Sequence, residues 1–499
     1  MKKVVFFAAI LTAILTSLPS CASETEGKTE IQSGSAGIPE TVQTTETVTE
    51  TESNTVLDDL GDFNFDGYTF TMLTPDPEIM NWANPVLNAT ETNGIRLNDA
   101  IYERNRSIES RFNMVFEEEY GSWDIGVNNL RTIVEADDNS YDIVTMIDRF
   151  ALNALAENLL IPYNEIPHVD LTKPYWGAEM LKYSSIGGKH YFAFGDFSLY
   201  AYDNTSALLF NKSLINNYTL ENPYELVRTK KWTLDKFSEL CSVVTGDTDG
   251  DTVMTEKDLY GYLSMPKQVL PSIWIAGGAL SIAKNDMDHP VLNFEDERFV
   301  SLIEKAFSVT WDTGTWYQND IQSDIDDTLE KMFINSHGLF HDSTFHKIQR
   351  LRDMDADFGI IPYPMADEAQ DAYYSRVSGA LFSTIPSTSR NLETQGVILE
   401  ALASESRKSV IPIYYEVSLK GRNTRDEESQ EMLDLIFSGR VYDLGDSFWC
   451  DDIRDNFIKK MFVKNDRNLS SNVASYKKSL SKKISRIIEQ ITAPESTAE

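Results

Sequence analysis

An acidic loop offers the most regularly spaced set of metal-ligating groups in the sequence. In the segment DTDGDTVMTEKD, oxygen-bearing groups occupy positions 1, 3, 5, 7, 9 and 12 of a calcium-binding loop. Gly250 stands at position 4, where such loops have their glycine at position 6, and the last ligand is an aspartate instead of a glutamate. The spacing predicts a structural calcium site, with a solvated acidic turn as the alternative. The groups belong to Asp247, Asp249, Asp251, Val253 through its carbonyl, Thr255 and Asp258.

The sequence lacks the common motifs of enzymatic chemistry. It has no Gly-x-x-x-x-Gly-Lys-Ser/Thr phosphate-binding loop and no Gly-x-Ser-x-Gly nucleophile elbow. His337 and His341 are four residues apart, but HGLFH has no glutamate of the zinc-protease motif after the first histidine. Acidic residues are abundant, so their number is compatible with the two carboxylates of a glycoside hydrolase. The sequence therefore has no recognised catalytic motif that would indicate a reaction.

The sequence predicts strands that alternate with helices, and these elements position the candidate residues. From Tyr68 onward, the apolar runs TFTML, MVFEEEY and YDIVTMI alternate with stretches whose apolar residues recur at helical spacing. ALLFNK, DFGIIPYP and ALFSTI continue this pattern, and helices dominate from Arg390. The alternation predicts an α/β architecture with parallel sheet. The roughly 440 residues behind the N-terminal region exceed one typical domain, so we expect two lobes with separate cores.

The N-terminus has the features of an exported lipoprotein. Lys2 and Lys3 precede an apolar run that ends just before Cys21, which predicts a signal peptide over residues 1–20 and lipidation of Cys21. Pro19 departs from the small residues usual at this place, so secretion with a free Cys21 is the alternative. Residues 21–60 are rich in Ser, Thr and Glu, which predicts a disordered tether. We expect an extracytoplasmic protein, lipid-anchored to the bacterial cell membrane.

The net charge disfavours one class of partner, and the cysteine content bears on disulfide bonds. The formal net charge of −34 disfavours nucleic acid, because phosphate contacts need clustered Lys and Arg on one face. Cys241 and Cys450 are the cysteines that remain behind Cys21. Two cysteines in a large exported chain do not form a disulfide scaffold, and the sequence does not decide whether they pair.

Several short motifs follow one another in a recognisable order. YDIVTMIDRF is followed by LAENLLIPY and by GGKHYFAFGDFSLYAYDNTSALLFNKSLI, and then by WTLDKFSELCSVVT, WIAGGAL, KMFINSHGLFHDS and DFGIIPYPM. In this order they resemble family 1 extracellular solute-binding proteins, the substrate-binding lipoproteins of bacterial ABC sugar importers. The resemblance covers nearly the whole chain from about Asp62. The sequence departs from the family at Ala193 to Gly195, where a proline is common, and at Phe210, where a tyrosine is common.

This resemblance implies a two-lobed, periplasmic-binding-protein-like fold of type II, with the ligand cleft between the lobes. Lobe I would comprise residues 61–195 and 361–405, and lobe II residues 196–360 and the helical residues 406–499. The chain would cross between the lobes near Phe192 to Ser206, Phe358 to Pro362 and Ser404 to Ile411. The implied protein is a monomeric binding protein, not an enzyme, and requires no cofactor. It captures a carbohydrate and delivers it to the transmembrane subunits of an ABC permease. A surface glycoside hydrolase and a glycan-binding or sensory lipoprotein without a transporter are the alternatives.

The resemblance also implies a set of ligand-binding residues. Sugar sites combine aromatic rings with carboxylates and arginines that bond the hydroxyls. Trp82 lies in a loop after the first strand, with packing of that loop as its alternative role. Asp148 and Arg149 follow YDIVTMI and resemble an Asp-Arg pair of maltose-binding relatives, with a helix N-cap by Asp148 as the alternative. Trp274 is equally suited to a core position. The other candidates are Tyr202 and Asp203 in the first crossing, Phe340, His341 and Trp449.

Overall fold

The computed structural model describes residues 58–80, 86–122, 127–318, 327–348, 351, 357–419 and 427–492. They belong to a unit that spans residues 54–499. The predicted signal peptide, Cys21, the predicted tether up to residue 57, and Trp82 lie outside the described residues. The chain is held against the first lobe from Asp58, whose carboxylate pairs with Arg111 and whose backbone N–H donates to Ser404 Oγ.

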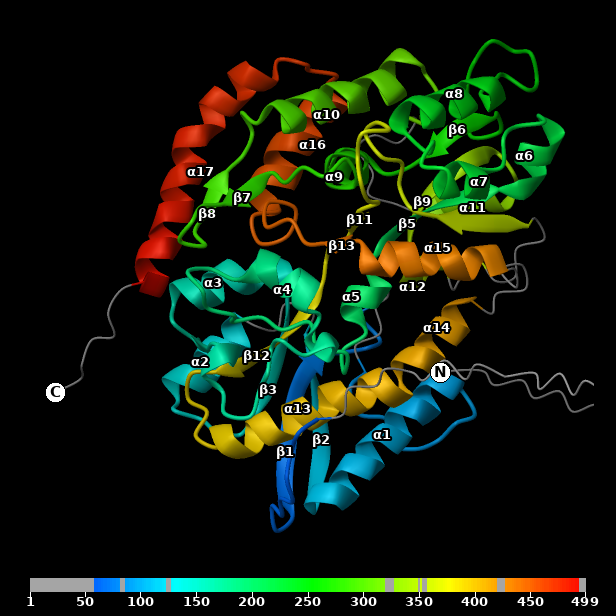
Figure 1. Cartoon of the computed structure of the whole chain (residues 1–499). Helices are drawn as coiled ribbons and strands as arrows, with labels where there is room; N and C mark the ends of the chain where they lie inside the picture. Colours follow the sequence, from blue (N-terminus) through cyan, green and yellow to red (C-terminus); the bar gives the residue numbers. More distant parts are fainter. Residues whose placement is uncertain are drawn as a thin grey trace, which may run out of the picture. The chain divides into compact units, whose positions relative to one another are not determined.

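A five-stranded sheet forms the core of the first lobe (Figure 1). Its strands are β1 (Tyr68–Pro75), β2 (Met114–Gly121), β3 (Ile143–Ile147), β4 (Leu160–Ile161) and β12 (Leu381–Pro386). In the order β2-β1-β3-β12-β4, the first three strands are parallel, and β12 runs antiparallel to both of its neighbours. Every residue of β3 is buried, as expected for a central strand with both faces covered.

Helices of the first lobe surround this sheet. They are α1 (Arg96–Phe112), α2 (Asn128–Glu135), α3 (Ala151–Ala156), α4 (Ala178–Ser184), α13 (Leu392–Ser409) and α14 (Ile411–Leu419), with the short helices η1 (Asp148–Phe150), η2 (Tyr163–Glu165) and η3 (Pro174–Trp176). The long helix α13 packs on α1 and η3. Its Gly396 permits a close backbone approach, because a Cβ there would lie 1.8 Å from the carbonyl oxygen of Pro167.

A four-stranded sheet forms the core of the second lobe. Its strands are β5 (Ser206–Asn211), β6 (Tyr260–Leu263), β9 (Gly338–Thr344) and β10 (Phe358–Ile361). In the order β10-β5-β9-β6, only β6 and β9 are parallel to each other. The helices of this part are α5 (Tyr200–Asp203), α6 (Lys212–Asn217), α7 (Pro223–Arg228), α8 (Leu234–Val244), α11 (Asp327–Ile334), α12 (Phe345–Ile348) and α15 (Glu427–Ser438). Helices α6 and α8 each begin with a side-chain cap. The Asn211 side chain accepts a hydrogen bond from the Leu214 N–H, and the Thr233 side chain accepts one from the Lys236 N–H.

A helical group with one hairpin adjoins the second sheet. It consists of α9 (Pro266–Ala276), β7 (Ile282–Lys284), β8 (Pro290–Leu292), α10 (Glu297–Phe307), η4 (Ser308–Asp312), η6 (Asp451–Ile458), α16 (Lys459–Val463) and α17 (Leu469–Thr492). Trp316 joins it to the sheet, because this residue bridges to Tyr262 and its ring lies 5.0 Å from that of Phe462. The lobe boundaries predicted from the sequence stay a prediction, although the two sheets lie within the predicted segments apart from the last residue of β10, Ile361.

Three chain segments cross side by side between the sheets. They run through Asn204 and Thr205, through β11 (Ser375–Arg376) to Val377, and through β13 (Arg440–Val441). Thr205 bridges to Val377, whose N–H donates to the carbonyl of Val441. The second and third crossings therefore differ from the predicted ones. The second was predicted near Phe358 to Pro362, but Phe358–Ile361 forms β10 and pairs with β5 inside the second sheet. The third was predicted near Ser404 to Ile411. There the chain continues as α13 and α14, which pack on α1 of the first lobe.

The β7–β8 hairpin and α17 also contact the first lobe. The Lys284 ammonium donates to the carbonyls of Lys182 and Ser185, and the Gly188 N–H donates to Asp288 Oδ2. At the end of α17, Gln490 Nε2 donates to the carbonyl of Ala156 in α3. These contacts join the lobes through residues that do not belong to the crossing segments.

Two further observations complete the fold. Cys241 and Cys450 are both buried and unpaired, so the structure shows no disulfide between them. Within the described ranges, no helix has the length and apolar character needed to cross a membrane.

Candidate functional site

A cavity of about 310 Å³ lies where strands of both sheets end. Ile147, Asp148 and Arg149 follow β3, Met265 and Lys267 follow β6, and Thr344 ends β9. The crossing segments supply the floor of the cavity with Asn204, Arg376, Ser378 and Gly379, and Gln268, Lys347 and Arg454 complete its wall. In α/β proteins, ligands bind beyond the carboxyl ends of strands and between domains. The cavity therefore has the position of a ligand site.

Asp148 is fixed in the wall of this cavity. Its Oδ2 accepts hydrogen bonds from the Ala380 N–H at 3.2 Å and from the Tyr442 hydroxyl at 3.1 Å. Burial raises the pKa of Asp148 to about 6, although the charge of Arg454 favours the ionised form. The side chain does not cap η1, so the N-cap alternative is not what the structure shows. Asp148 therefore lines the cavity, and its contact with a ligand stays a prediction.

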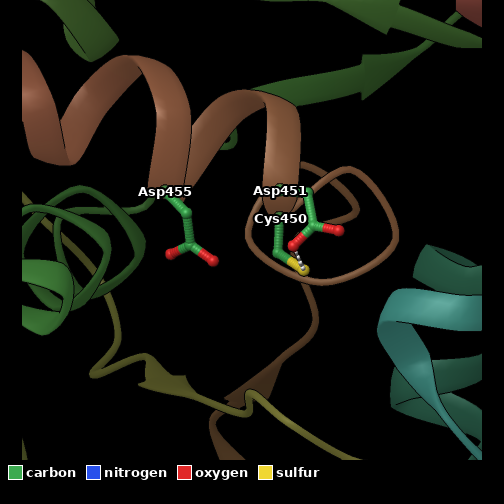
Figure 2. Close-up of side chains that lie close together, drawn as sticks. All are labelled: Cys450, Asp451 and Asp455. Atoms are coloured by element: carbon green, nitrogen blue, oxygen red, sulfur yellow. Dashed lines mark hydrogen bonds between the residues drawn. The ribbon is translucent and has the colours of Figure 1, made fainter. Parts of the chain in front are cut away.

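Arg149 also lines the cavity and pairs with carboxylates of η6. Its guanidinium lies 3.0 Å from Asp451 Oδ1 and 3.3 Å from Asp455 Oδ2. Figure 2 shows these two side chains with Cys450 at the start of η6. Burial raises the pKa of the Cys450 thiol to about 12, so the thiolate that a metal ion or a nucleophilic reaction needs is disfavoured. With Arg149 on both carboxylates, the group is an ion-pair cluster that orients Arg149.

A buried ion-pair group lies beneath the cavity. Asp446 is fully buried and accepts from Arg376 Nε at 2.6 Å and from Arg376 Nη2 at 2.9 Å. Arg454 Nη1 donates to the carbonyl oxygen of Asp446 at 2.9 Å. The two-pronged bond fixes the plane of the Arg376 guanidinium, because such a fork has one favourable geometry. The third nitrogen of that guanidinium, Nη1, has no hydrogen-bond partner in the part of the chain that the structure describes.

The structure corrects the prediction that six other residues contact a ligand. Phe340 packs between Trp232 and Phe237, with ring centroids 5.3 and 5.2 Å away, and Trp274 donates its Nε1–H to Asp443. All six side chains are at most 1 % exposed and none lines the cavity. Their apolar surface is covered by protein, so they stabilise the lobes. These residues are Tyr202, Asp203, Trp274, Phe340, His341 and Trp449.

Tyr202 and Asp203 have structural partners at the first crossing. The Tyr202 hydroxyl donates to Asp196 Oδ1 at 2.7 Å, and the Arg440 guanidinium lies 4.2 Å from the centre of its ring. Asp203 accepts a hydrogen bond from the Tyr414 hydroxyl at 2.8 Å. Both residues therefore fasten the crossing to α14 and β13.

In the acidic loop, three of the six predicted calcium ligands come together. One oxygen each of Asp247, Asp249 and Asp258 lies within 4.8 Å of the others. Backbone N–H groups of Thr252 and Gly250 hold the pKa of Asp247 below its usual value, and the N–H of Thr248 does the same for Asp258. Asp251 is not part of this group, whereas the Thr255 hydroxyl donates to Asp258 Oδ2 at 3.2 Å. Calcium binding by the loop stays a prediction.

Sequence reasoning missed several residues of the cavity wall. Lys267 and Gln268 lie in the first turn of α9, which follows β6 in the chain. Because ligands often bind beyond the ends of strands, their place in the sequence indicated a position at the site. Arg376 and Arg454 carry no comparable signal, because they reach the cavity from a crossing segment and from η6. The other missed residues are Asn204, Thr344, Lys347 and Ser378.

Solved structures share this fold at low sequence identity. The sugar-binding protein MalE from Xanthomonas citri matches with a TM-score of 0.57 and 11 % identity, over 84 % of this chain and 98 % of that one. An ABC substrate-binding protein from Listeria monocytogenes in complex with cycloalternan matches with a TM-score of 0.52 and 10 % identity, over 84 % and 100 %. UgpB from Mycobacterium tuberculosis in complex with glycerophosphocholine matches with a TM-score of 0.54 and 15 % identity, over 78 % and 95 %.

No protein-family model matches the sequence, and no curated protein matches it. The structural matches span the relatives nearly end to end, so the chain has the two-lobed fold of the periplasmic binding proteins. This confirms the fold class predicted from the sequence.

Proposed function

We propose that this chain is the extracytoplasmic solute-binding subunit of an ABC importer, and that it captures a carbohydrate in the cavity between its two sheets. The observation that carries the proposal is the position of the cavity, which lies at the carboxyl ends of β3, β6 and β9 and on two of the three crossing segments. A ligand there contacts both lobes only when they are close together, so binding shifts the protein toward its closed state. Proteins of the same fold are described as sugar-binding or as bound to cycloalternan.

The wall of the cavity argues against glycoside hydrolysis. Hydrolases of this kind use two carboxyl groups on either side of the scissile bond. Among the described residues that line the cavity, Asp148 is the single carboxylate. One carboxylate can accept hydrogen bonds from sugar hydroxyls, but it cannot supply both an acid and a base or nucleophile. The cavity is therefore suited to reversible binding.

The function is tested by a thermal-shift screen against mono- and oligosaccharides, amino acids and peptides, followed by calorimetry. A ligand that binds only the folded state raises the melting temperature by mass action. We expect a carbohydrate to stabilise the protein, to lower its radius of gyration and to be recovered chemically unchanged. Stabilisation by amino acids or peptides alone would refute the carbohydrate assignment, and steady cleavage of a bound oligosaccharide would establish the hydrolase in its place.

Variants connect the binding to the cavity. Asp148→Ala should weaken binding about tenfold or more, because a hydrogen bond to a charged group contributes about 1.5–3 kcal/mol. Asp286→Ala is the matched control, since it removes an exposed carboxylate from the β7–β8 turn. Trp82→Ala tests the predicted stacking residue in the same way. Equal affinity of wild type and Asp148→Ala would place the site elsewhere.

A further inference from the structure

The cavity wall has the opposite charge to the protein as a whole. The chain carries a formal net charge of −34. The cavity wall nevertheless contains five cationic side chains and one carboxylate among its described residues. A concave site lined by one sign of charge concentrates ligands of the other sign. The cations are Arg149, Lys267, Lys347, Arg376 and Arg454, and the carboxylate is Asp148.

Arg376 is the cation of the wall whose orientation the structure fixes most closely. Its side chain is 2 % exposed, and Asp446 occupies Nε and Nη2 from below. Nη1 is enclosed and has no acceptor among the described residues. Buried donors are nearly always satisfied, and a charged donor without an acceptor is costly. Arg376 lines the cavity, so a ligand bound there is a candidate acceptor for Nη1.

The arginines of the wall are held in place by carboxylates that do not line the cavity. Asp446 lies under Arg376 and Arg454, and Asp451 and Asp455 lie beside Arg149. These acids orient the guanidinium groups without occupying the cavity wall. The arrangement therefore presents positive charge to a ligand and keeps the countercharges behind it.

Helix α9 adds a second positive element at the wall. It runs for 11 residues, begins with Pro266, and has no side-chain cap on its first turn. Its first turn supplies Lys267 and Gln268 to the cavity. The N-terminus of a helix carries a partial positive charge, which favours an anion, and in α9 the Gln268 N–H is already bonded to the carbonyl of Met265. The positive end of α9 adds to the attraction for an anion. Arg376 and the other cations of the wall are the main source of that attraction.

We propose that the ligand of this cavity is an acidic carbohydrate, whose carboxylate bonds Arg376 Nη1 and lies between the charges of Lys267 and Lys347. The inference rests on the proposed function and narrows its substrate class. Arg376 leaves one guanidinium nitrogen for the ligand, and the carboxylate of Asp148 in the same wall repels a divalent phosphate more than a monovalent carboxylate. Asp148 then accepts the hydroxyls of the same sugar, so the two signs of charge contact different parts of one ligand.

Matched pairs of sugars test the charge directly. The probes are trimers of galacturonate, glucuronate and mannuronate, each with its fully methyl-esterified form, together with maltotriose and glucose 6-phosphate. Esterification removes the charge and keeps the ring. We expect one acidic trimer to bind at least tenfold more tightly than its ester. Its affinity should fall as NaCl rises from 20 to 500 mM, because salt screens the attraction.

Each outcome separates the inference from the proposed function. Equal binding of acid and ester, or binding of neutral sugars only, overturns the inference and leaves carbohydrate capture intact. Binding of glucose 6-phosphate without any uronate overturns the carboxylate assignment. Failure of every sugar to bind refutes both proposals.

Variants then place the charge in the cavity. Arg376→Gln should abolish the preference for the acid, but it also removes a partner of buried Asp446 and can unfold the protein. Lys267→Gln and Lys347→Gln alter partly exposed residues of the wall and should each weaken binding of the acid about threefold to fivefold. Binding of the ester should change less than twofold. Lys477→Gln removes the same charge from exposed α17 and should leave both affinities unchanged. Loss of acid binding in the Lys477 variant alone would overturn the proposal.

Discussion

Replacing Asp148 by asparagine should stabilise the protein at neutral pH. Asp148 is 3 % exposed, and burial raises its pKa from 3.8 in the unfolded chain to about 6. Both hydrogen bonds that it accepts reach Oδ2, so the amide oxygen of an asparagine can accept them in the same place. The substitution therefore removes an ionisation that the fold disfavours and keeps the bonds that the fold uses.

The size of the effect follows from the pKa difference. Below pH 4 the carboxyl group is protonated in both states and its ionisation does not affect stability. Between pH 4 and 6 the unfolded chain loses the proton while the native state retains it, so the free energy of unfolding of the wild type falls. A difference of about 2 pKa units corresponds to about 3 kcal/mol. The loss is complete above the native pKa, so the Asp148→Asn variant should be about 3 kcal/mol more stable at pH 7.5 and equally stable at pH 3.5.

Thermal unfolding at several pH values measures this difference. Unfolding a body of this size, residues 54–499, has an entropy of about 0.9 kcal/mol/K at about 2.1 cal/mol/K per residue. Asp148→Asn should therefore raise the melting temperature by about 3 °C at pH 7.5. Asp196, whose pKa burial also raises to about 6, is present in both proteins and cancels from the difference. Asp286→Asn, in the exposed turn, is the control and should not shift the melting temperature.

The dependence on pH is the decisive part of this experiment. A gain that is the same at pH 3.5 and 7.5 would show that the amide packs better, and not that ionisation is disfavoured. A variant that is less stable at pH 7.5 would refute the reasoning. It would mean that the attraction of Asp148 to Arg454 exceeds the cost of burying the charge.

Three further predictions address other parts of the chain. Cys21→Ala should leave the protein folded and release it from membranes into the medium, as fractionation and lipid labelling will show, and unchanged membrane retention would contradict lipidation. Removal of calcium with a chelator should lower the melting temperature of the wild type but not of Asp249→Ala, and identical wild-type curves with calcium and chelator would exclude a metal site. Gly396→Ala should cost several kcal/mol or prevent folding, because its Cβ would meet the carbonyl of Pro167, whereas Gly61→Ala has no atom within 4 Å and should be neutral in denaturant unfolding.

The sequence predicted the fold well because its signals are local. The apolar run YDIVTMI became the buried strand β3, and its end placed Asp148 and Arg149 at the cavity. A periodic pattern fixes such an element without reference to the rest of the chain. The second and third crossings were predicted wrongly. Phe358–Ile361 pairs inside the second sheet as β10, and α13 and α14 continue along α1 through contacts between distant segments.

The ligand site was predicted only in part because residue type does not distinguish a core from a cavity wall. Trp274 and Phe340 are aromatic, as sugar-stacking residues are, yet both are enclosed by the packing of other segments. Arg376 was missed because its residue type alone does not indicate a place at a binding site. Its role depends on Asp446, 70 positions further along the chain, and on the cavity above it. Both errors concern contacts between segments that are distant in sequence.

The contacts of the β7–β8 hairpin constrain how the two lobes can turn. The crossing segments hold the lobes at one point, and Lys284 with the carbonyls of Lys182 and Ser185 holds them at a second. Two fixed points define a line, and a rigid body that keeps both contacts can only rotate about that line. Residues near this axis travel little, while displacement grows in proportion to the distance from it. Breaking the Lys284 contact would release two further rotational degrees of freedom, so that the cavity could twist as well as open.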